Sequence, residues 1–240
     1  MRSERPVALV TGVGRRAGIG AAIAERLSAD GWLVASTHWQ PYDARMPWGP
    51  DPVALGDFSV EADLADPSAP ALLFDHVVSA VGNVTALVLA HCESVDSSLL
   101  DTSLDSFDRH FAVNTRANWL LMREFALRFA GPHGTGRIVA LTSDAVVGNV
   151  PYGASKGALD RLVVAAAAEL GPRGITANAV NPGPTDTGWM DGPLQTTIRT
   201  RTPLGRLGTP RDCANLVSFL CGPDGAWVTG QLLTSHGGLS

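Results

Sequence analysis

The sequence has few cysteines, and their arrangement is not typical of a site. Cys92, Cys213 and Cys221 are odd in number and lack the close paired spacing of a zinc or redox centre. The sequence therefore predicts no metal site. The three thiols are expected to be reduced and mostly packed in the interior.

Long hydrophobic runs and an excess of positive charge are also missing. No apolar run approaches the ~18 residues that span a bilayer, and the N-terminus enters a strand pattern without an apolar leader and cleavage site. The formal net charge of -5 offers no basic surface to a polyanion. These absences predict a cytoplasmic protein that binds neither membranes nor nucleic acid.

The chain of 240 residues shows no internal repeat and no interdomain linker, so a single domain, 1–240, is expected. Short apolar runs alternate with longer segments of helical character, which predicts an α/β fold with parallel strands joined by crossover helices. The expected strands include 7–10, 32–36, 87–90, 137–141 and 175–180, and the expected helices include 19–30 and 154–170.

A glycine-rich loop, TGVGRRAGIG, directly follows the first predicted strand and precedes a helix. Glycines permit a tight turn and a close approach of phosphate to backbone N–H groups, and the N-terminus of the helix favours an anion. Gly12, Gly18 and Gly20 are therefore candidate pyrophosphate contacts. The alternative interpretation is an ordinary glycine-rich turn.

Basic residues at this loop favour NADP(H) over NAD(H), which stays the alternative. Arg15 and Arg16 lie inside the loop, and the second predicted strand ends near His38 without the acidic residue that would hold an unphosphorylated ribose. Guanidinium groups suit a 2′-phosphate, and His38 is a weaker candidate. Both arginines could instead be solvated loop charges.

The segment 37–57 is too rich in proline and glycine for a regular helix and longer than most connections, so it is predicted to be a flap or a surface insertion. Trp39, Tyr42 or Trp48 is expected to cover the adenosine end of the cofactor.

Ser143 follows a predicted strand, and Tyr152 precedes Lys156 by four residues, which places both side chains on one helix face. A fixed ammonium favours the phenolate of a neighbouring tyrosine and lowers its pKa. A serine hydroxyl can bind a reacting carbonyl or alcohol oxygen. The three residues suit hydride transfer with Tyr152 as general acid and base.

Several motifs together resemble the short-chain dehydrogenase/reductase family, including members similar to 3-oxoacyl-carrier-protein reductase. These are the glycine loop with GIG, the YGASK segment, Asn114 in AVNTRAN, and NPGPTDT after the sixth predicted strand. The resemblance covers nearly the whole chain. It implies a Rossmann fold, a doubly wound parallel sheet of about seven strands with helices on both faces.

The resemblance also implies roles for single residues. Ser143 would orient the substrate, Tyr152 exchange the proton, Lys156 bind the nicotinamide ribose and lower the tyrosine pKa, and Asn114 support a water relay. Ile19 and Ala90 are further expected cofactor contacts. The family also implies that Asp63 and Leu64 lie near the adenine and that the segment with Pro182, Gly183, Thr185 and Thr187 borders the nicotinamide.

Three departures from the family pattern leave alternatives open. The glycine loop is longer than usual, LAHC at 89–92 replaces NNAG, and only nine positions separate Ser143 from Tyr152. The short loop opens the substrate site or shifts Ser143. His91 contacts substrate or, as we favour, is packed and satisfied locally.

The resulting expectation is an NADP(H)-dependent oxidoreductase that interconverts a ketone, aldehyde or ketoacyl thioester and an alcohol. The alternatives are an enoyl-type reductase and a catalytically weak NADPH-sensing protein. Substrate selection is expected in a lid at 184–205, where Trp189, Met190 and Leu194 contact substrate or simply pack. The family implies a homotetramer or homodimer.

Overall fold

The computed structural model describes residues 5–51 and 58–239 of the chain. Seven parallel strands form one sheet with the order β3-β2-β1-β4-β5-β6-β7. The strands are β1 (Val7–Thr11), β2 (Leu33–His38), β3 (Phe58–Glu61), β4 (Val84–Leu89), β5 (Gly136–Leu141), β6 (Ile175–Asn181) and β7 (Leu232–Thr234). The predicted doubly wound α/β sheet is confirmed.

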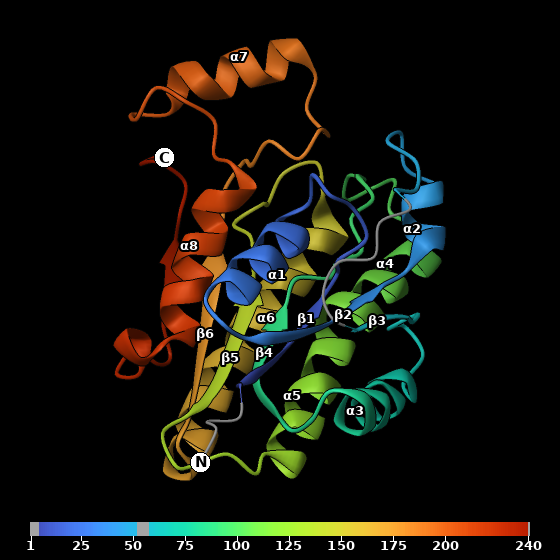
Figure 1. The fold of residues 1–240 in the computed structure, drawn as a ribbon. Coiled ribbons are helices and arrows are strands. Elements are labelled where there is room, and N and C mark those ends of the chain that lie inside the picture. The colour runs from blue at the N-terminus through green and yellow to red at the C-terminus, as the bar shows by residue number, and fades with distance from the viewer. Residues whose placement is uncertain (1–4, 52–57, 240) are drawn as a thin grey trace.

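Helices cover both faces of this sheet (Figure 1). They are α1 (Ile19–Ala29), α2 (Gln40–Ala44), α3 (Ala69–Ala80), α4 (Leu104–Phe111), α5 (Ala117–Arg128), α6 (Val150–Leu170), α7 (Gly192–Arg201) and α8 (Pro210–Cys221). A π-helical turn, Ala112–Arg116, joins α4 to α5, and short 3-10 turns occupy Gly171–Arg173 and Pro223–Gly225.

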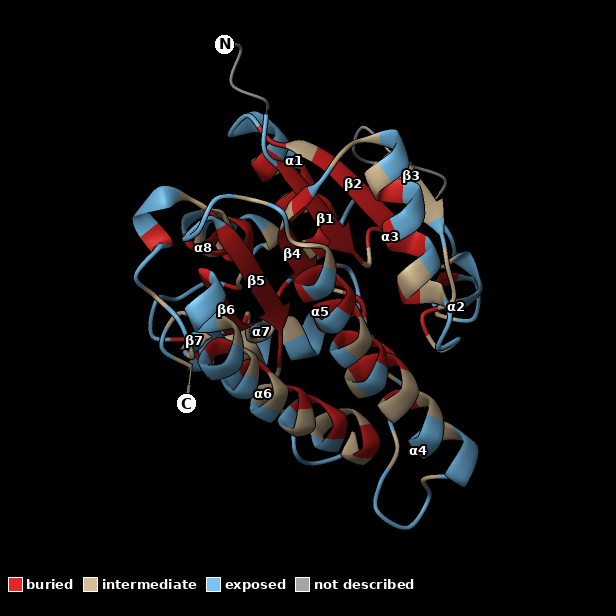
Figure 2. Cartoon of the chain, turned by 90° about the horizontal axis from the view of Figure 1, so that it is seen from below, coloured by how far each residue is buried: buried red, intermediate tan, exposed pale blue. Residues whose placement is uncertain are grey.

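Two hydrophobic layers hold the helices to the sheet. On one face, α1 and α8 pack against strand residues that include Ala8, Val10 and Val88. On the other, α3, α5 and α6 pack against residues that include Leu9 and Leu87. Figure 2 shows the strands buried between these helices. Burial on both faces explains why β1 and β4 appear in the sequence as continuous apolar runs.

The order of the strands reverses between β1 and β4, because β1 continues to β2 on one side and β4 continues to β5 on the other. In open α/β sheets, ligands bind outside the carboxyl ends of the strands at such a switch point. The glycine loop leaves β1 and the LAHC segment leaves β4 at this place, so the topology positions a candidate site there.

The structure differs from the sequence-based expectation at some boundaries. The prediction that 37–57 contains no regular helix is wrong for Gln40–Ala44, because Pro41 lies in the first turn, where its missing N–H costs nothing. Residues 52–57 of this segment lie outside the described residues. Helix α6 begins at Val150, before the predicted start at 154, again with a proline in its first turn.

In 5–51 and 58–239, none of the helices has both the length and the apolar character needed to cross a membrane. Within the same ranges, His, Cys, Asp and Glu side chains do not gather into a group of three or more that could hold a metal ion.

Candidate active site

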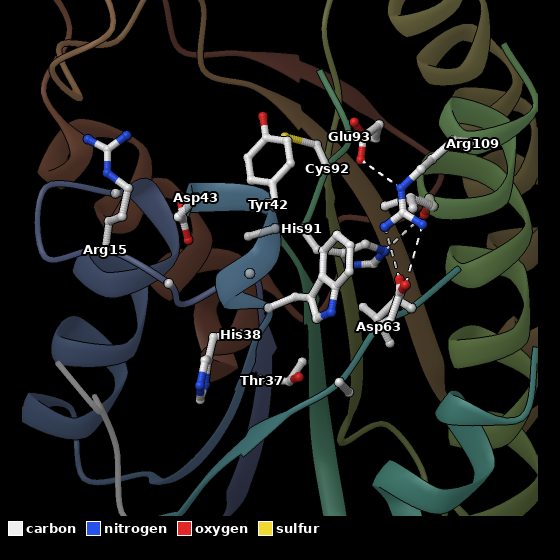
Figure 3. Close-up of a pocket in the computed structure, with 18 residues that line it drawn as sticks. Arg15, Thr37, His38, Tyr42, Asp43, Asp63, His91, Cys92, Glu93 and Arg109 are labelled. Atoms are coloured by element: carbon white, nitrogen blue, oxygen red, sulfur yellow. Dashed lines mark hydrogen bonds and ion pairs between the residues drawn. The ribbon is translucent and has the colours of Figure 1, made fainter. Parts of the chain in front are cut away.

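A pocket lies at the carboxyl ends of β1, β2, β3 and β4, at the switch point of the sheet (Figure 3). It combines the glycine loop, the start of the 37–51 segment and the chain after β4. Its lining residues are Gly12, Gly14, Arg15, Gly18, Thr37, His38, Trp39, Tyr42, Asp43, Ala62, Asp63, Leu64, Ala90, His91, Cys92, Glu93, Arg109 and Val113. Seven of the predicted cofactor residues are therefore brought to one cavity.

Two positions of the loop require glycine, because neighbouring backbone atoms lie where a Cβ atom would be. Gly12 has φ of +76°, and a Cβ there would lie 2.5 Å from the amide nitrogen of His91. A Cβ at Gly20 would lie 2.5 Å from the carbonyl oxygen of Gly12. The loop thus folds tightly between β4 and the start of α1. Gly18, the N-cap of α1, has no side chain, so the first-turn amides of α1 are left for an external partner.

The three residues predicted to bind a 2′-phosphate are not brought together. The Arg15 guanidinium donates a hydrogen bond to the carbonyl oxygen of Thr187 and lies 4.5 Å from the Trp48 ring. The Arg16 amide bonds Asp51, and the His38 ring contacts Ser59 at 3.1 Å. Figure 3 shows Arg15 and His38 pointing in opposite directions.

Arg15 therefore links the glycine loop to the segment that follows β6. Its side chain lines the pocket, whereas Arg16 is exposed and does not line it. Of the two arginines, only Arg15 is positioned for a ligand in this arrangement.

His91 is a packed residue, which confirms the favoured interpretation of LAHC. The ring is buried; Nε2 lies 3.1 Å from the carbonyl oxygen of Val113 and Nδ1 lies 2.7 Å from the Thr11 hydroxyl. A carbonyl only accepts, so Nε2 carries the proton and Thr11 donates to Nδ1. Burial, with the nearby charge of Lys156, lowers the pKa of His91 to about 3 and keeps the ring neutral.

Glu93 is a buried carboxylate shared by two arginines. Arg45 Nη2 lies 2.5 Å from Glu93 Oε2, and Arg109 Nε lies 3.2 Å from the same oxygen. Arg109 also pairs with Asp63 at 3.1 Å, as the dashed lines in Figure 3 show. Both guanidinium groups lie over the Trp39 ring, at 5.8 Å for Arg45 and 4.4 Å for Arg109. This ion-pair cluster fixes α2 and α4 to the chain after β4.

The same cluster contains the residues that sequence reasoning missed. Arg45, Glu93 and Arg109 lie on segments that are far apart in the sequence, and no local pattern connects them. The only available signal was the position of Glu93 directly after LAHC. Of the three aromatic residues expected over the adenosine end, Trp39 and Tyr42 line the pocket, and Trp48 contacts Arg15 and Asp43.

Ser143 and Tyr152 come together despite their short connection. Burial raises the pKa of Tyr152 well above its ordinary value, and the Ser143 hydroxyl beside it acts in the opposite direction with a smaller effect. Tyr152 therefore holds its proton at neutral pH. The short loop between the two residues has not moved Ser143 away from the tyrosine.

Lys156 lies on the same face of α6 as Tyr152. Its Nζ is 5.6 Å from the centre of the Tyr152 ring and donates a 2.8 Å hydrogen bond to the carbonyl oxygen of Leu141. Burial lowers the pKa of Lys156. The expected lowering of the tyrosine pKa by this ammonium is not what the arrangement gives, because the desolvation of the phenol dominates.

Cys92 places a side chain beside these groups, where the family pattern has glycine. The residue lines the pocket together with Tyr42 and His91. Burial raises the pKa of the Cys92 thiol. The thiol is therefore a neutral packing group in this pocket rather than a nucleophile.

Asn114 is fully buried in the π-helical turn between α4 and α5, a feature often found at functional sites. Its Oδ1 accepts a 2.7 Å bond from the Glu93 amide, and its Nδ2 donates to the Glu93 carbonyl oxygen at 2.8 Å and to Ser155 Oγ at 2.9 Å. Ser155 Oγ in turn donates to the carbonyl oxygen of Tyr152 at 2.8 Å. The asparagine thus connects the chain after β4 to α6, the helix that carries Tyr152 and Lys156.

The segment after β6 reaches the pocket through Arg15 and Thr187. Gly183 has φ of +61°, and its amide bonds Asn181 Oδ1 at 2.9 Å. Thr185 is buried, and its hydroxyl lies 3.2 Å from the Gly183 carbonyl oxygen. Pro182, Gly183, Thr185 and Thr187 do not line the pocket themselves, and neither do Ile19, Gly20, Asn114, Ser143, Tyr152 or Lys156.

A nicotinamide dinucleotide fits the chemistry of this site. The glycine cradle leaves no room for a Cβ at Gly12, and the amide groups of α1 face it. Asp63 and Leu64 line the far part of the pocket. The groups beside the pocket are a protonated phenol, a serine hydroxyl and a buried ammonium, which together can bind an oxygen atom and move a proton.

Comparisons with known proteins agree with this geometry. A family model described as enoyl-(acyl carrier protein) reductase matches residues 12–240. An uncharacterized oxidoreductase of Bacillus subtilis is 35% identical, with 98% of this chain and 97% of that protein covered.

Solved structures give the same result. A short-chain dehydrogenase from Burkholderia cenocepacia in complex with NADP is 37% identical with a TM-score of 0.85, covering 98% of this chain and 97% of that one. A blue fluorescent protein from a metagenomic library in complex with NADPH is 33% identical with a TM-score of 0.84, covering 98% of both chains. The chain belongs to the short-chain dehydrogenase/reductase family, whose members are oxidoreductases that bind a nicotinamide cofactor.

Proposed function

We propose that this oxidoreductase reduces a ketone, aldehyde or ketoacyl thioester with NADPH, and oxidises the corresponding alcohol in reverse. The observation that carries this proposal is the pair of Ser143 and Tyr152, which lie close together beside the buried Lys156. Such a pair can bind a carbonyl oxygen and supply the proton it needs as it becomes a hydroxyl.

Four residues have separate roles in the proposed reaction. The cofactor, when bound, supplies or accepts a hydride. Ser143 donates a hydrogen bond to the carbonyl oxygen, and Tyr152, which burial keeps protonated, transfers its proton to that oxygen. Lys156 holds the nicotinamide ribose, and Asn114 supports the relay of water that restores the proton of Tyr152.

NADP(H) is the proposed cofactor because Arg15 lines the pocket and the end of β2 contributes Thr37 and His38 without a carboxylate. The NADP and NADPH complexes of the two similar structures support the same assignment. The remaining proposed contacts are Gly12, Gly18, Ile19, Gly20, Asp63, Leu64, Ala90 and the segment 182–187.

The test is a parallel titration with NADPH and NADH that follows nicotinamide fluorescence, followed by a screen of aldehydes and ketones with the better cofactor. Tight NADPH binding, weak NADH binding and NADPH consumption with a carbonyl compound are expected. Absence of binding by either cofactor would favour a protein that has kept the fold and lost its ligand.

An enoyl-type reduction is the second candidate, and the description of the matching family model favours it. The four-residue spacing of Tyr152 and Lys156 favours the carbonyl substrate instead. An enoyl thioester offered in the same screen separates the two reactions. NADPH consumption with the enoyl compound alone would reverse their order.

Substrate selection is assigned to the lid at 184–205, which includes α7 at the carboxyl end of the sheet (Figure 1). Trp189 is half exposed, and its indole nitrogen donates to the Thr185 carbonyl oxygen at 3.1 Å, whereas Met190 is buried. Of the two, Trp189 is available to a substrate. We also propose a homodimer or homotetramer, and a sedimentation experiment that detects only monomer would refute it.

A further inference from the structure

Side chains from two successive turns of α6 form hydrogen bonds with two successive residues at the end of β5. Lys156 Nζ donates to the carbonyl oxygen of Leu141 at 2.8 Å. One helical turn later, Asp160 Oδ1 accepts a 2.5 Å hydrogen bond from the hydroxyl of Thr142. Residues four apart lie on the same face of a helix. The pair of contacts therefore joins α6 to the strand end that leads directly into Ser143.

The burial of Lys156 gives this arrangement an electrostatic consequence. Lys156 is 2% exposed, and burial disfavours its charged form. The titratable groups that face it are His91 and Cys92 from the chain after β4, and Tyr152 and Asp160 from α6. Charges on Cys92 and, to a smaller extent, on Asp160 raise the pKa of Lys156. Because burial raises the pKa of the Cys92 thiol and keeps it neutral, the carboxylate of Asp160 is the negative charge among these described neighbours.

The neighbours of Asp160 fix its side chain and favour its charged form. It is partly buried, and burial raises its pKa, whereas the Thr142 hydrogen bond and the charges of Lys156 and Arg161 lower it. Arg161 is exposed to solvent, so its charge is screened more strongly than that of the buried Lys156. The Thr142 hydroxyl is thus the direct anchor of the carboxylate.

We propose that Asp160, anchored by Thr142, is a positioning residue that keeps Lys156 charged and fixes Ser143 against the helix that carries Tyr152. The inference rests on the proposed function for its catalytic consequence. Its electrostatic part concerns the protein alone and can be measured without any substrate.

The composition of the chain makes the measurement direct, because Lys156 is its only lysine. In protein labelled with ¹³C at lysine Cε, the side-chain signal belongs to Lys156 without assignment. We expect Asp160→Asn to lower the pKa of Lys156 by about one unit relative to the unsubstituted protein, since it removes the nearby negative charge.

Glu169→Gln is the matched control, because it removes one carboxylate from an exposed position on the same helix. It should leave the Lys156 titration unchanged. Identical titrations for Asp160→Asn and Glu169→Gln would overturn the inference.

Kinetics test the catalytic consequence. With a carbonyl substrate, the pH at which kcat/KM declines on the alkaline side should move down in Asp160→Asn together with the Lys156 titration. Thr142→Val should lower kcat about tenfold, because the carboxylate loses its anchor, and Thr142→Ser should restore it. Unchanged kcat in Thr142→Val would refute the anchoring role, even if Asp160→Asn did not fold.

The two failures are distinguishable. If the unsubstituted protein reduces no carbonyl compound, the proposed function fails, while the NMR titration still decides whether Asp160 supports the charge of Lys156.

Discussion

At the scale of single residues, burial decides the protonation of the two groups beside the pocket. It raises the pKa of Tyr152, so the phenol keeps its proton at neutral pH, and it lowers the pKa of Lys156, while the charges of neighbouring groups act in the opposite direction. The chemistry proposed for the site follows from these two environments.

Replacing Tyr152 with phenylalanine removes the proposed proton donor and little else. We expect Tyr152→Phe to lower kcat for carbonyl reduction at least about 100-fold, which is the usual minimum for loss of a general acid. NADPH affinity, measured by fluorescence titration, should stay within about twofold because the ring still packs. Turnover that survives in this variant would rule out the mechanism. Loss of both turnover and NADPH binding would point to misfolding.

Arg15 can bind the 2′-phosphate of the cofactor or hold the Thr187 segment, and one substitution distinguishes these two roles. If its guanidinium binds the 2′-phosphate, Arg15→Ala should weaken NADPH binding by about 10- to 100-fold and leave NADH binding almost unchanged, because a hydrogen bond to a charged group is worth ~1.5–3 kcal/mol. Equal weakening of both cofactors would show that Arg15 acts by holding the Thr187 segment. The exposed Arg16 supplies the control, and Arg16→Ala should have the smaller effect.

At the scale of elements, the ion pairs of Glu93 connect parts of the chain that the sheet does not. Arg45 follows α2, Arg109 belongs to α4, and Glu93 lies beyond β4. Glu93 is 3% exposed, and because an unpaired buried charge is costly, the two arginines stabilise it at this position. The wall of the pocket therefore depends on charge pairing as well as on packing.

Glu93→Gln should lower the free energy of unfolding by about 2 kcal/mol, measured by urea denaturation, because two arginines lose their shared buried carboxylate. The control is Asp75→Asn, which removes the exposed partner of Arg128 and should change stability by less than about 0.5 kcal/mol. Equal effects of the two substitutions would mean that the Glu93 cluster contributes nothing beyond a surface ion pair.

At the scale of the whole molecule, His91 joins the centre of the sheet to the helices behind it. Its ring bonds Thr11 at the end of β1 and Val113 in the π-helical turn. In the folded protein the pKa of His91 is about 3, against an ordinary value of 6.5, so the ring is neutral when the chain is folded.

This difference links stability to pH. Between pH 6.5 and about 3 the unfolded chain binds a proton that the folded chain excludes, so the free energy of unfolding should fall as the pH falls, by up to ~1.4 kcal/mol per pH unit from this residue. Urea denaturation between pH 7 and pH 5 measures the slope. His91→Asn should flatten it, and His76→Asn, at an exposed position, should not. Equal slopes in all three proteins would contradict this account.

Much of the architecture followed from local pattern. The buried strands β1, β4, β5 and β6 are short apolar runs, and the glycine loop and the Tyr152–Lys156 spacing are signals within one segment. Boundaries were less accurate where prolines begin helices, as in α2 and α6, and the short edge strand β3 was not singled out.

The sequence by itself therefore determined the fold class, the glycine-rich turn after the first strand and the candidate catalytic residues, because each depends on side-chain periodicity or backbone geometry over a few neighbouring positions. Only the tertiary structure decided which side chains pair across distant segments. Arg15 donates a hydrogen bond to the Thr187 carbonyl oxygen, and Glu93 forms ion pairs with Arg45 and Arg109. Asp160, one helical turn after Lys156, accepts a hydrogen bond from Thr142. These contacts join distant segments, and burial, which sets the protonation of each site, exists only once the chain has packed.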